Sequence, residues 1–301
     1  MKKTILIACL GLVSLGLQAQ SISLAGEWNV ELGKSGSAFA KSKRASQGEE
    51  KRAILPGTID TNHLGFAPKD TMETTHLTRL YAYKGAARYS RTINIPKDWK
   101  KKPVELFLER TRPTWVYVDG ELVDSCNFIS TPQRYLLPKK VKPGKHFLEI
   151  VVDNGRGVPE QVYGSSHAYT EDTQTNWNGI IGEIRLEVKS EERRVKNSNV
   201  LPDFAKDFHI KGAHFYANGH RIFLRGKHDA AVWPLTGHVE MSVEGWMKYL
   251  GTCKEYGINH VRFHSWCPPE AAFVAADSLG IYLQPELPFW EIGRASCRER
   301  V

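Results

Sequence analysis

The hydrophobic positions of the chain follow two different periods, one in each half of the sequence. From residue 21 to about 190, short β-rich runs alternate apolar and polar side chains, and Gly and Pro turns separate the runs. Beyond residue 205 the pattern becomes that of amphipathic helices placed between short apolar strands. This change of period predicts two structural units.

The first unit, residues 21–190, is predicted to be all-β. Asp119-Gly120 can take the positive φ angles of a tight hairpin turn, and Pro143-Gly144 is a second turn signal. No helical period interrupts the strand pattern, so the sequence indicates a jelly-roll sandwich. The strand pattern covers Trp28–Leu32, Tyr89–Ile95, Val104–Glu109, Thr114–Val118, His146–Val152 and Ile184–Val188.

The second unit, residues 212–291, alternates strands and helices with short links, which is typical of a parallel α/β domain. Ser242 is a candidate helix cap, and Gly257 and Gly280 can end the two helices. A closed eight-fold barrel takes ~250 residues, so we expect only a truncated (β/α)8-barrel segment of about three strands. The expected strands are 221–225, 258–263 and 281–286, and the expected helices are 242–257 and 270–279.

The two ends of the chain are expected to lie outside the fold. Lys2 and Lys3 precede an apolar run, and Ala19 follows at a plausible cleavage point, so residues 1–20 are predicted to be a signal peptide of a secreted or periplasmic protein. The apolar run is too short to span a membrane. Residues 292–301 resemble a translated sequencing adaptor and are treated as foreign.

Composition narrows the function only slightly. Without both ends, the formal charge falls from +8 to about +4, and the lysine runs look scattered in solvated loops, so no nucleic-acid partner is expected. Three cysteines remain with no metal-like spacing, which argues against a disulfide framework. No cofactor is predicted.

Candidate functional residues follow the ends of the predicted parallel strands, where barrel enzymes gather their chemistry. Tryptophan rings can pack on a pyranose, and imidazole and carboxylate groups can hydrogen-bond its hydroxyls, so an oligo- or polysaccharide partner is expected. Each residue could instead have a purely structural role, as part of an internal ion pair or as a core side chain. The proposed substrate-binding set is His228, Asp229, Arg262, His264, Trp266 and Glu286, with Trp233 and Trp290 nearby.

Two other chemistries are alternatives for these residues. His228, Asp229, His264 and Glu286 are ligand types for zinc or iron, but no pair of histidines stands one residue apart on the first strand, so no metal is expected. A serine nucleophile is not favoured because no Gly-x-Ser-x-Gly turn occurs.

At these residues the chain resembles the family 2 glycoside hydrolases, the β-galactosidase and β-glucuronidase kind. The resemblance covers about residues 22–190 and 207–291. It departs from the family at Lys227–Ala230 and Phe263–Trp266, and the predicted linker 191–211 is far too short for the immunoglobulin-like domain (~100 residues,) that the family places there. The matching motifs are Leu55–Thr58, Trp115–Gly120, Trp177–Ile180, Asn218-Gly219, Phe223–Gly226, Val261-Arg262 and Leu279–Tyr282.

The resemblance implies hydrolysis of β-linked sugars with retention, by two glutamates ~5–5.5 Å apart. In the family these glutamates come from later strands. We therefore expect no catalytic residue in this chain, an inactive N-terminal part of an enzyme, and a site-shaping role for Glu286. The alternative is a non-catalytic glycan-binding module of jelly-roll type, with Tyr81, Tyr83, Trp115 and Tyr117 as candidate aromatics.

Overall fold

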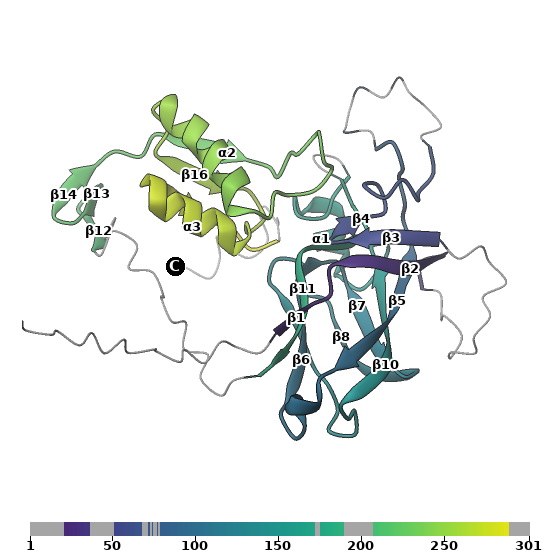
Figure 1. Cartoon of the computed structure of the whole chain (residues 1–301). Helices are drawn as coiled ribbons and strands as arrows, with labels where there is room; N and C mark the ends of the chain where they lie inside the picture. The colour runs from purple at the N-terminus through teal and green to yellow at the C-terminus, as the bar shows by residue number, and fades with distance from the viewer. Residues whose placement is uncertain are drawn as a thin grey trace, which may run out of the picture.

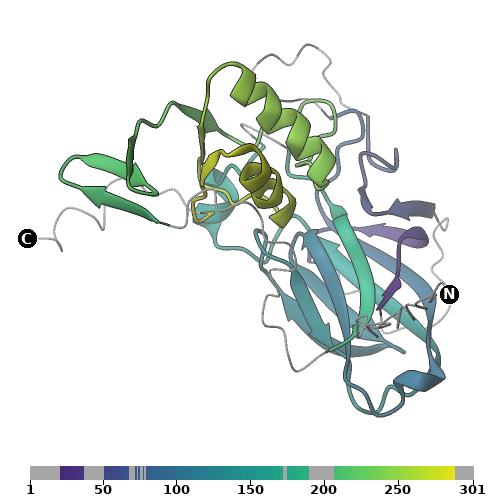
Figure 2. The same cartoon turned by 60° about the vertical axis from the view of Figure 1, so that its left-hand side comes forward.

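The computed structural model describes residues 21–36, 51–67, 72, 74, 77, 79–171, 175–189 and 207–288. The predicted signal peptide, the predicted foreign tail, Trp290 and most of the predicted linker lie outside the described residues. A larger all-β unit and a smaller α/β unit pack against each other (Figures 1 and 2).

The all-β unit is a sandwich of two antiparallel sheets. One sheet has the strand order β1-β11-β6-β9, with β4 also paired to β11, and the other has the order β3-β2-β5-β10-β7-β8. The first sheet contains β1 (Ser21–Ser23), β4 (Gly57–Thr58), β6 (Val104–Thr111), β9 (Gln133–Leu136) and β11 (Gly179–Val188). The second contains β2 (Gly26–Gly33), β3 (Lys51–Leu55), β5 (Ala86–Ile95), β7 (Thr114–Val118), β8 (Glu121–Cys126) and β10 (Gly144–Asp153).

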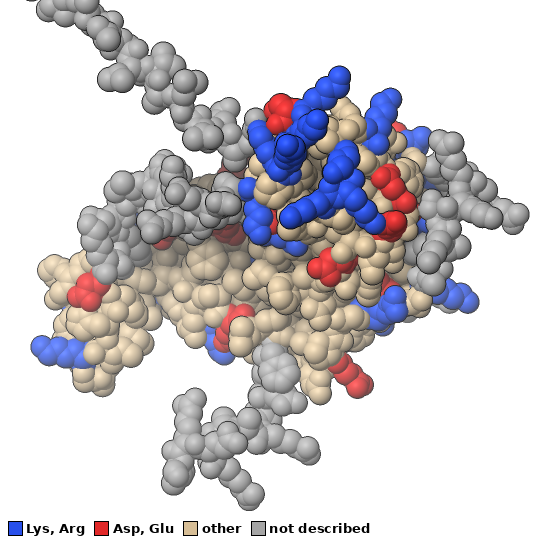
Figure 3. Space-filling model, turned by 90° about the horizontal axis from the view of Figure 1, so that it is seen from below, with Lys and Arg blue, Asp and Glu red and all other residues tan. Residues whose placement is uncertain are grey.

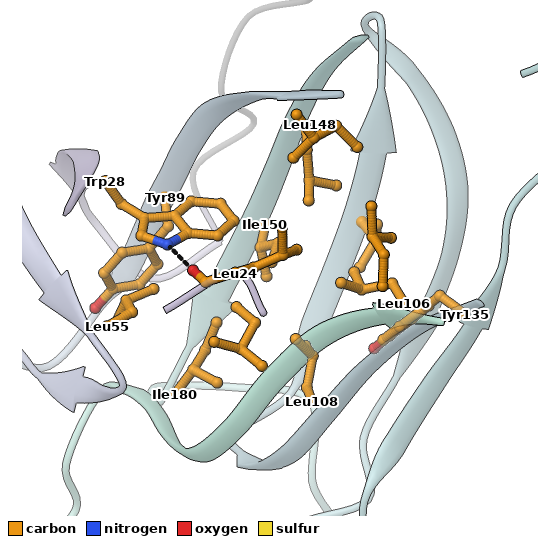
Figure 4. Close-up of a cluster of buried hydrophobic side chains, with 14 of the residues drawn as sticks. Leu24, Trp28, Leu55, Tyr89, Leu106, Leu108, Tyr135, Leu148, Ile150 and Ile180 are labelled. Carbon is orange, nitrogen blue, oxygen red and sulfur yellow. Dashed lines mark hydrogen bonds between the residues drawn. The ribbon is translucent and has the colours of Figure 1, made fainter. Parts of the chain in front are cut away.

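Alternation along these strands creates the core between the sheets. Leu106 and Leu108 of β6 point into the core with Ile150 of β10. Trp28 is buried in the same core, and its indole N–H donates to the carbonyl of Leu24 at 3.0 Å (Figure 4). All six strands predicted from the sequence are confirmed. The predicted Asp119-Gly120 turn joins β7 to β8, with φ angles of 53° and 80°.

The α/β unit has three parallel strands in the order β15-β16-β17. Both predicted helices are confirmed. Ser242 Oγ accepts from the N–H of Gly245 at 3.0 Å, and Gly280 takes the left-handed conformation that ends the second helix. The elements are β15 (Gly226–Asp229), α2 (Val243–Glu255), β16 (His260–Phe263), α3 (Glu270–Leu279) and β17 (Tyr282–Gln284).

The prediction of the first parallel strand at 221–225 is wrong. His220–Ile222 is β14 of a small antiparallel sheet, with β12 (Phe208–Lys211) and β13 (His214–Ala217), and the parallel strand begins at Gly226. Asn218 and Gly219, both with positive φ, turn β13 into β14. A short apolar run does not reveal by itself whether it pairs in a hairpin or in a parallel sheet. The last four residues of the predicted linker are strand β12.

The two units meet at one end of the sandwich. Arg110, near the end of β6, donates to the carbonyl of Cys267 at 2.8 Å, and Ser166 Oγ donates to the carbonyl of Ser265 at 2.9 Å. Trp177 and Ile181 of the sandwich belong to the apolar core of the α/β unit. The junction is therefore both polar and hydrophobic.

The opposite end of the sandwich is basic. The 3-10 helix η1 (Lys97–Trp99) follows β5, and the loop before β10 lies beside it because Gly144 pairs with Ile95. Lysines that look scattered in sequence therefore gather at this end, where Figure 3 shows a group of Lys and Arg side chains. The lysines of η1, of the two loops and of the start of β10 are Lys97, Lys100, Lys101, Lys102, Lys139, Lys140, Lys142 and Lys145.

Candidate functional site

The carboxyl ends of the three parallel strands form one edge, and four of the predicted residues meet there. His228 and Arg262 are register partners on β15 and β16, His264 follows β16, and Glu286 follows β17. The N–H of His264 donates to the carbonyl of Asp229 at 2.8 Å, which joins the first two strand ends. We call His228, Arg262, His264 and Glu286 the rim.

Three imidazoles come together at the rim, and one of them belongs to the sandwich. His167 Nε2 lies 2.8 Å from His264 Nδ1, and the ring centroids of His228 and His264 are 5.0 Å apart. Burial, followed by repulsion from His264 and His228, lowers the pKa of His167. The cluster therefore favours a neutral His167. No local sequence pattern marks His167, because the sandwich places it there through tertiary packing.

Glu286 fastens the rim. Its Oε1 pairs with the guanidinium of Arg262 at 2.6 Å, and its Oε2 accepts the N–H of Ser265 at 2.8 Å. Burial alone would raise the pKa of Glu286, but these two partners outweigh it and the pKa lies below its ordinary value. A carboxylate held in its charged form is unsuited to act as a general acid, whereas it orients Arg262 and the Ser265 turn well.

Asp229 lies beneath the rim and serves the fold. Its Oδ1 accepts the N–H of Ala231 at 2.8 Å, and its Oδ2 accepts from Lys227 at 3.1 Å and from the hydroxyl of Tyr249. The residue is only 6% exposed. With both oxygens engaged and little surface, Asp229 supports the turn after β15 and leaves little for a ligand to contact.

Trp266, a predicted sugar contact, lies in the core of the α/β unit. Trp266 is 1% exposed, packs on Phe263 with ring centroids 4.9 Å apart, and donates its indole N–H to the carbonyl of Asp229 at 3.2 Å. The sequence places it after a strand end, where a tryptophan can face either solvent or core. Here the core carbonyl satisfies its only polar atom, so burial wins.

A buried arginine of the sandwich holds the segment that meets the rim. Arg112 lies over Trp177, with 4.1 Å from its guanidinium carbon to the ring centroid, and donates to the carbonyls of Trp177 (3.0 Å), Ala168 (2.5 Å) and Thr175 (3.3 Å). Burial lowers the pKa of Arg112 to about 10, so it stays charged at neutral pH. Arg112 therefore positions the segment that carries His167, and no pattern in the sequence identified it.

Within the described ranges, no group of three or more His, Cys, Asp or Glu side chains is arranged to hold a metal ion. In the same part of the chain, the helices are all too short or too polar to cross a membrane.

The arrangement defines a class of protein: an antiparallel β-sandwich that leads into a parallel α/β unit, with a polar rim beside the junction. No protein-family profile and no curated protein sequence matches the chain. Solved structures do match it, and they include β-glucuronidases and β-galacturonidases, the latter named as glycoside hydrolase family 2.

Three of these structures show the extent of the likeness. The β-glucuronidase of Faecalibacterium prausnitzii aligns with 91% of this chain at a TM-score of 0.66 and 14% identity. The family 2 β-galacturonidase of Eisenbergiella tayi aligns with 90% of this chain, at a TM-score of 0.62 and 16% identity. The β-D-glucuronidase of Dictyoglomus thermophilum aligns with 91% of this chain, also at a TM-score of 0.62 and 16% identity. The chain spans 60%, 58% and 59% of those proteins, respectively.

The fold of the family 2 structures is thus confirmed for this chain. The resemblance read from the sequence motifs and the likeness of the structures agree, although they rest on different observations. At 14–16% identity the likeness concerns the fold. The likeness does not identify which residues of those enzymes correspond to the individual rim residues.

Proposed function

We propose that this chain is the N-terminal part of an exported family 2 glycoside hydrolase that cleaves a β-linked sugar with retention. The observation that carries the proposal is a single structural alignment that runs through both the sandwich and the α/β unit of β-glucuronidases and a β-galacturonidase. The junction between the units places His167 of the sandwich beside the rim, so both units contribute to one site. We expect a glycan, including uronic sugars, as the ligand of this site.

The rim supports binding better than bond cleavage. Retaining hydrolysis needs one carboxylate as nucleophile and a second carboxyl group as acid/base, ~5–5.5 Å apart. Among the described residues of the rim and the turn beneath it, Glu286 is an ion-paired carboxylate and Asp229 is a buried support for the turn. We therefore propose that the 301-residue chain is inactive and that two glutamates of later barrel strands complete the enzyme. Residues 1–20 would direct its export.

A direct test compares cleavage with binding. The purified chain is offered 4-nitrophenyl β-D-glucuronide, β-D-galacturonide and β-D-galactoside, and release of nitrophenol is followed while binding is measured by calorimetry. We expect no turnover. If one of these sugars binds, Glu286→Gln should bind it more weakly, because the carboxylate that orients Arg262 is lost. Lys140→Gln, at the basic end, is the matched control.

Two results would contradict the proposal. Turnover that co-purifies with the chain and survives removal of contaminating hydrolases would show that the chain itself is catalytic. A gene that continues past the codon for Glu291 without adding β/α repeats and paired glutamates would remove the proposed enzyme and leave the alternative, a glycan-binding module.

A further inference from the structure

A cavity of about 370 Å³ lies where the sandwich meets the loop after β15. Its volume falls in the range of pockets for small ligands, ~300–1,000 Å³. No rim residue lines it. The sandwich contributes Asp60, His63, Arg79, Tyr81 and Thr175 to its wall, and the loop contributes Trp233.

Two residues of the wall have a buried polar atom that lacks a hydrogen-bond partner in the described part of the chain. They are Oδ1 of Asp60, an acceptor, and Nε1 of Trp233, a donor. Buried polar atoms are seldom left unpaired in native proteins, so each one calls for an explanation. A hydroxyl group both donates and accepts. One polyhydroxylated ligand can therefore pair with both atoms after small rotations of the two side chains.

The charges of the wall favour an uncharged ligand. Arg79 pairs with Asp60 at 3.2 Å and with Glu171 at 2.7 Å, and its side chain is only 7% exposed. Two carboxylates thus already exceed the single positive charge of Arg79. An anionic sugar would bring a third carboxylate to one guanidinium, which is unfavourable in a partly buried site.

The wall also offers flat rings. His63 and Tyr81 are stacked, with centroids 4.6 Å apart and an interplanar angle of 21°. Trp233 is held from behind by Trp246 and Tyr249, each with its ring centroid 5.5 Å away. Aromatic rings that are fixed in place provide the apolar surface on which the C–H face of a pyranose packs.

We propose that this cavity binds an uncharged pyranose unit, separate from the rim. The inference rests on the proposed function only in taking a glycan as the ligand: the rim would hold the sugar whose bond is cut, and the cavity would hold a neutral sugar elsewhere in the same glycan. Substrate choice would then depend on both units of the chain.

The test uses saturation-transfer NMR on the intact chain with lactose and cellobiose as neutral probes and glucuronate as the anionic probe. We expect a neutral disaccharide to bind, and Trp233→Phe to weaken its Kd about fivefold, the size expected for one lost hydrogen bond. Tyr81→Ala should weaken it further. Tyr256→Ala, an exposed aromatic on another surface, is the matched control, and thermal melts check that each variant folds.

The outcomes separate this inference from the proposed function. Binding that is unchanged in both Trp233→Phe and Tyr81→Ala, displacement of the neutral probe by glucuronate, or no binding of either disaccharide would overturn the inference. The rim is tested independently by Glu286→Gln. A cavity that binds neutral sugars in a protein whose extended form cleaves none would support the inference and sink the proposed function.

Discussion

The sandwich and the α/β unit bury their apolar side chains in different ways. The sandwich core lies between its own two sheets, from Leu24 to Leu186, and among the described residues it includes none from the smaller unit. The α/β core around Trp246 and Phe263 includes Trp177 from the sandwich. The larger unit is therefore self-sufficient, whereas the smaller unit depends on its neighbour. Because of this asymmetry, a core substitution that unfolds the sandwich should also unfold the α/β unit, whereas one that unfolds the α/β unit should leave the sandwich folded.

A matched pair of substitutions tests that direction and should give the largest effects. Trp28 and Trp246 are both 0% exposed, one in each core. Replacing either by Ala should cost about 3–5 kcal/mol of stability, the range for truncating a buried tryptophan. Trp28→Ala should unfold both units. Trp246→Ala should unfold only the α/β unit, leaving a protease-resistant core near residues 21–189. Limited proteolysis with mass spectrometry measures whether this core persists. Its loss in Trp246→Ala would contradict the asymmetry.

The shared tryptophan should have an intermediate effect. Trp177→Leu removes the ring under Arg112 and part of the α/β core, so we expect a loss of about 2 kcal/mol. Hydrogen exchange should report the loss mainly in α2 and α3, with the central strands β5 and β10 little changed. Equal loosening of both units would show that the sandwich also depends on the junction.

The smallest effect concerns pH at the junction. The pKa of His167 is lowered in the folded chain. As the pH falls below ~6.5, His167 takes up a proton in the unfolded chain before it does so in the folded chain. The folded chain therefore loses stability as the pH falls from ~6.5 to the lower pKa that His167 has in the folded state. Asp229 and Glu286 face the cluster and oppose the shift. We expect a lower melting temperature at pH 5.5 than at pH 7.5, and a smaller difference in His167→Gln. An identical difference in both proteins would rule out His167 as the cause.

Local patterns predicted most of the fold. Six strands, the Asp119-Gly120 turn, the Ser242 cap and the Gly280 helix end all follow from residues close together in sequence. The first parallel strand begins later than predicted, because Asn218-Gly219 forms a hairpin turn and His220–Ile222 joins the antiparallel sheet.

The site could be predicted only in part. His228, Arg262, His264 and Glu286 follow from strand ends, which a sequence reveals. His167 and Arg112 depend on contacts between distant segments and carry no local signal. The orientation of Trp266 was decided by one carbonyl in the core, and a period of apolar residues does not report such a partner.

Arg112 has a consequence for how such a chain can diverge. The segment that it holds carries His167 toward the rim, Thr175 toward the cavity and Trp177 into the neighbouring core. Mutations in this segment that alter the proposed sugar preference would therefore tend to loosen the attachment of the α/β unit as well. New specificities should be reached more readily through the loop after β15, whose Leu235 is almost fully exposed and can vary without disturbing that attachment.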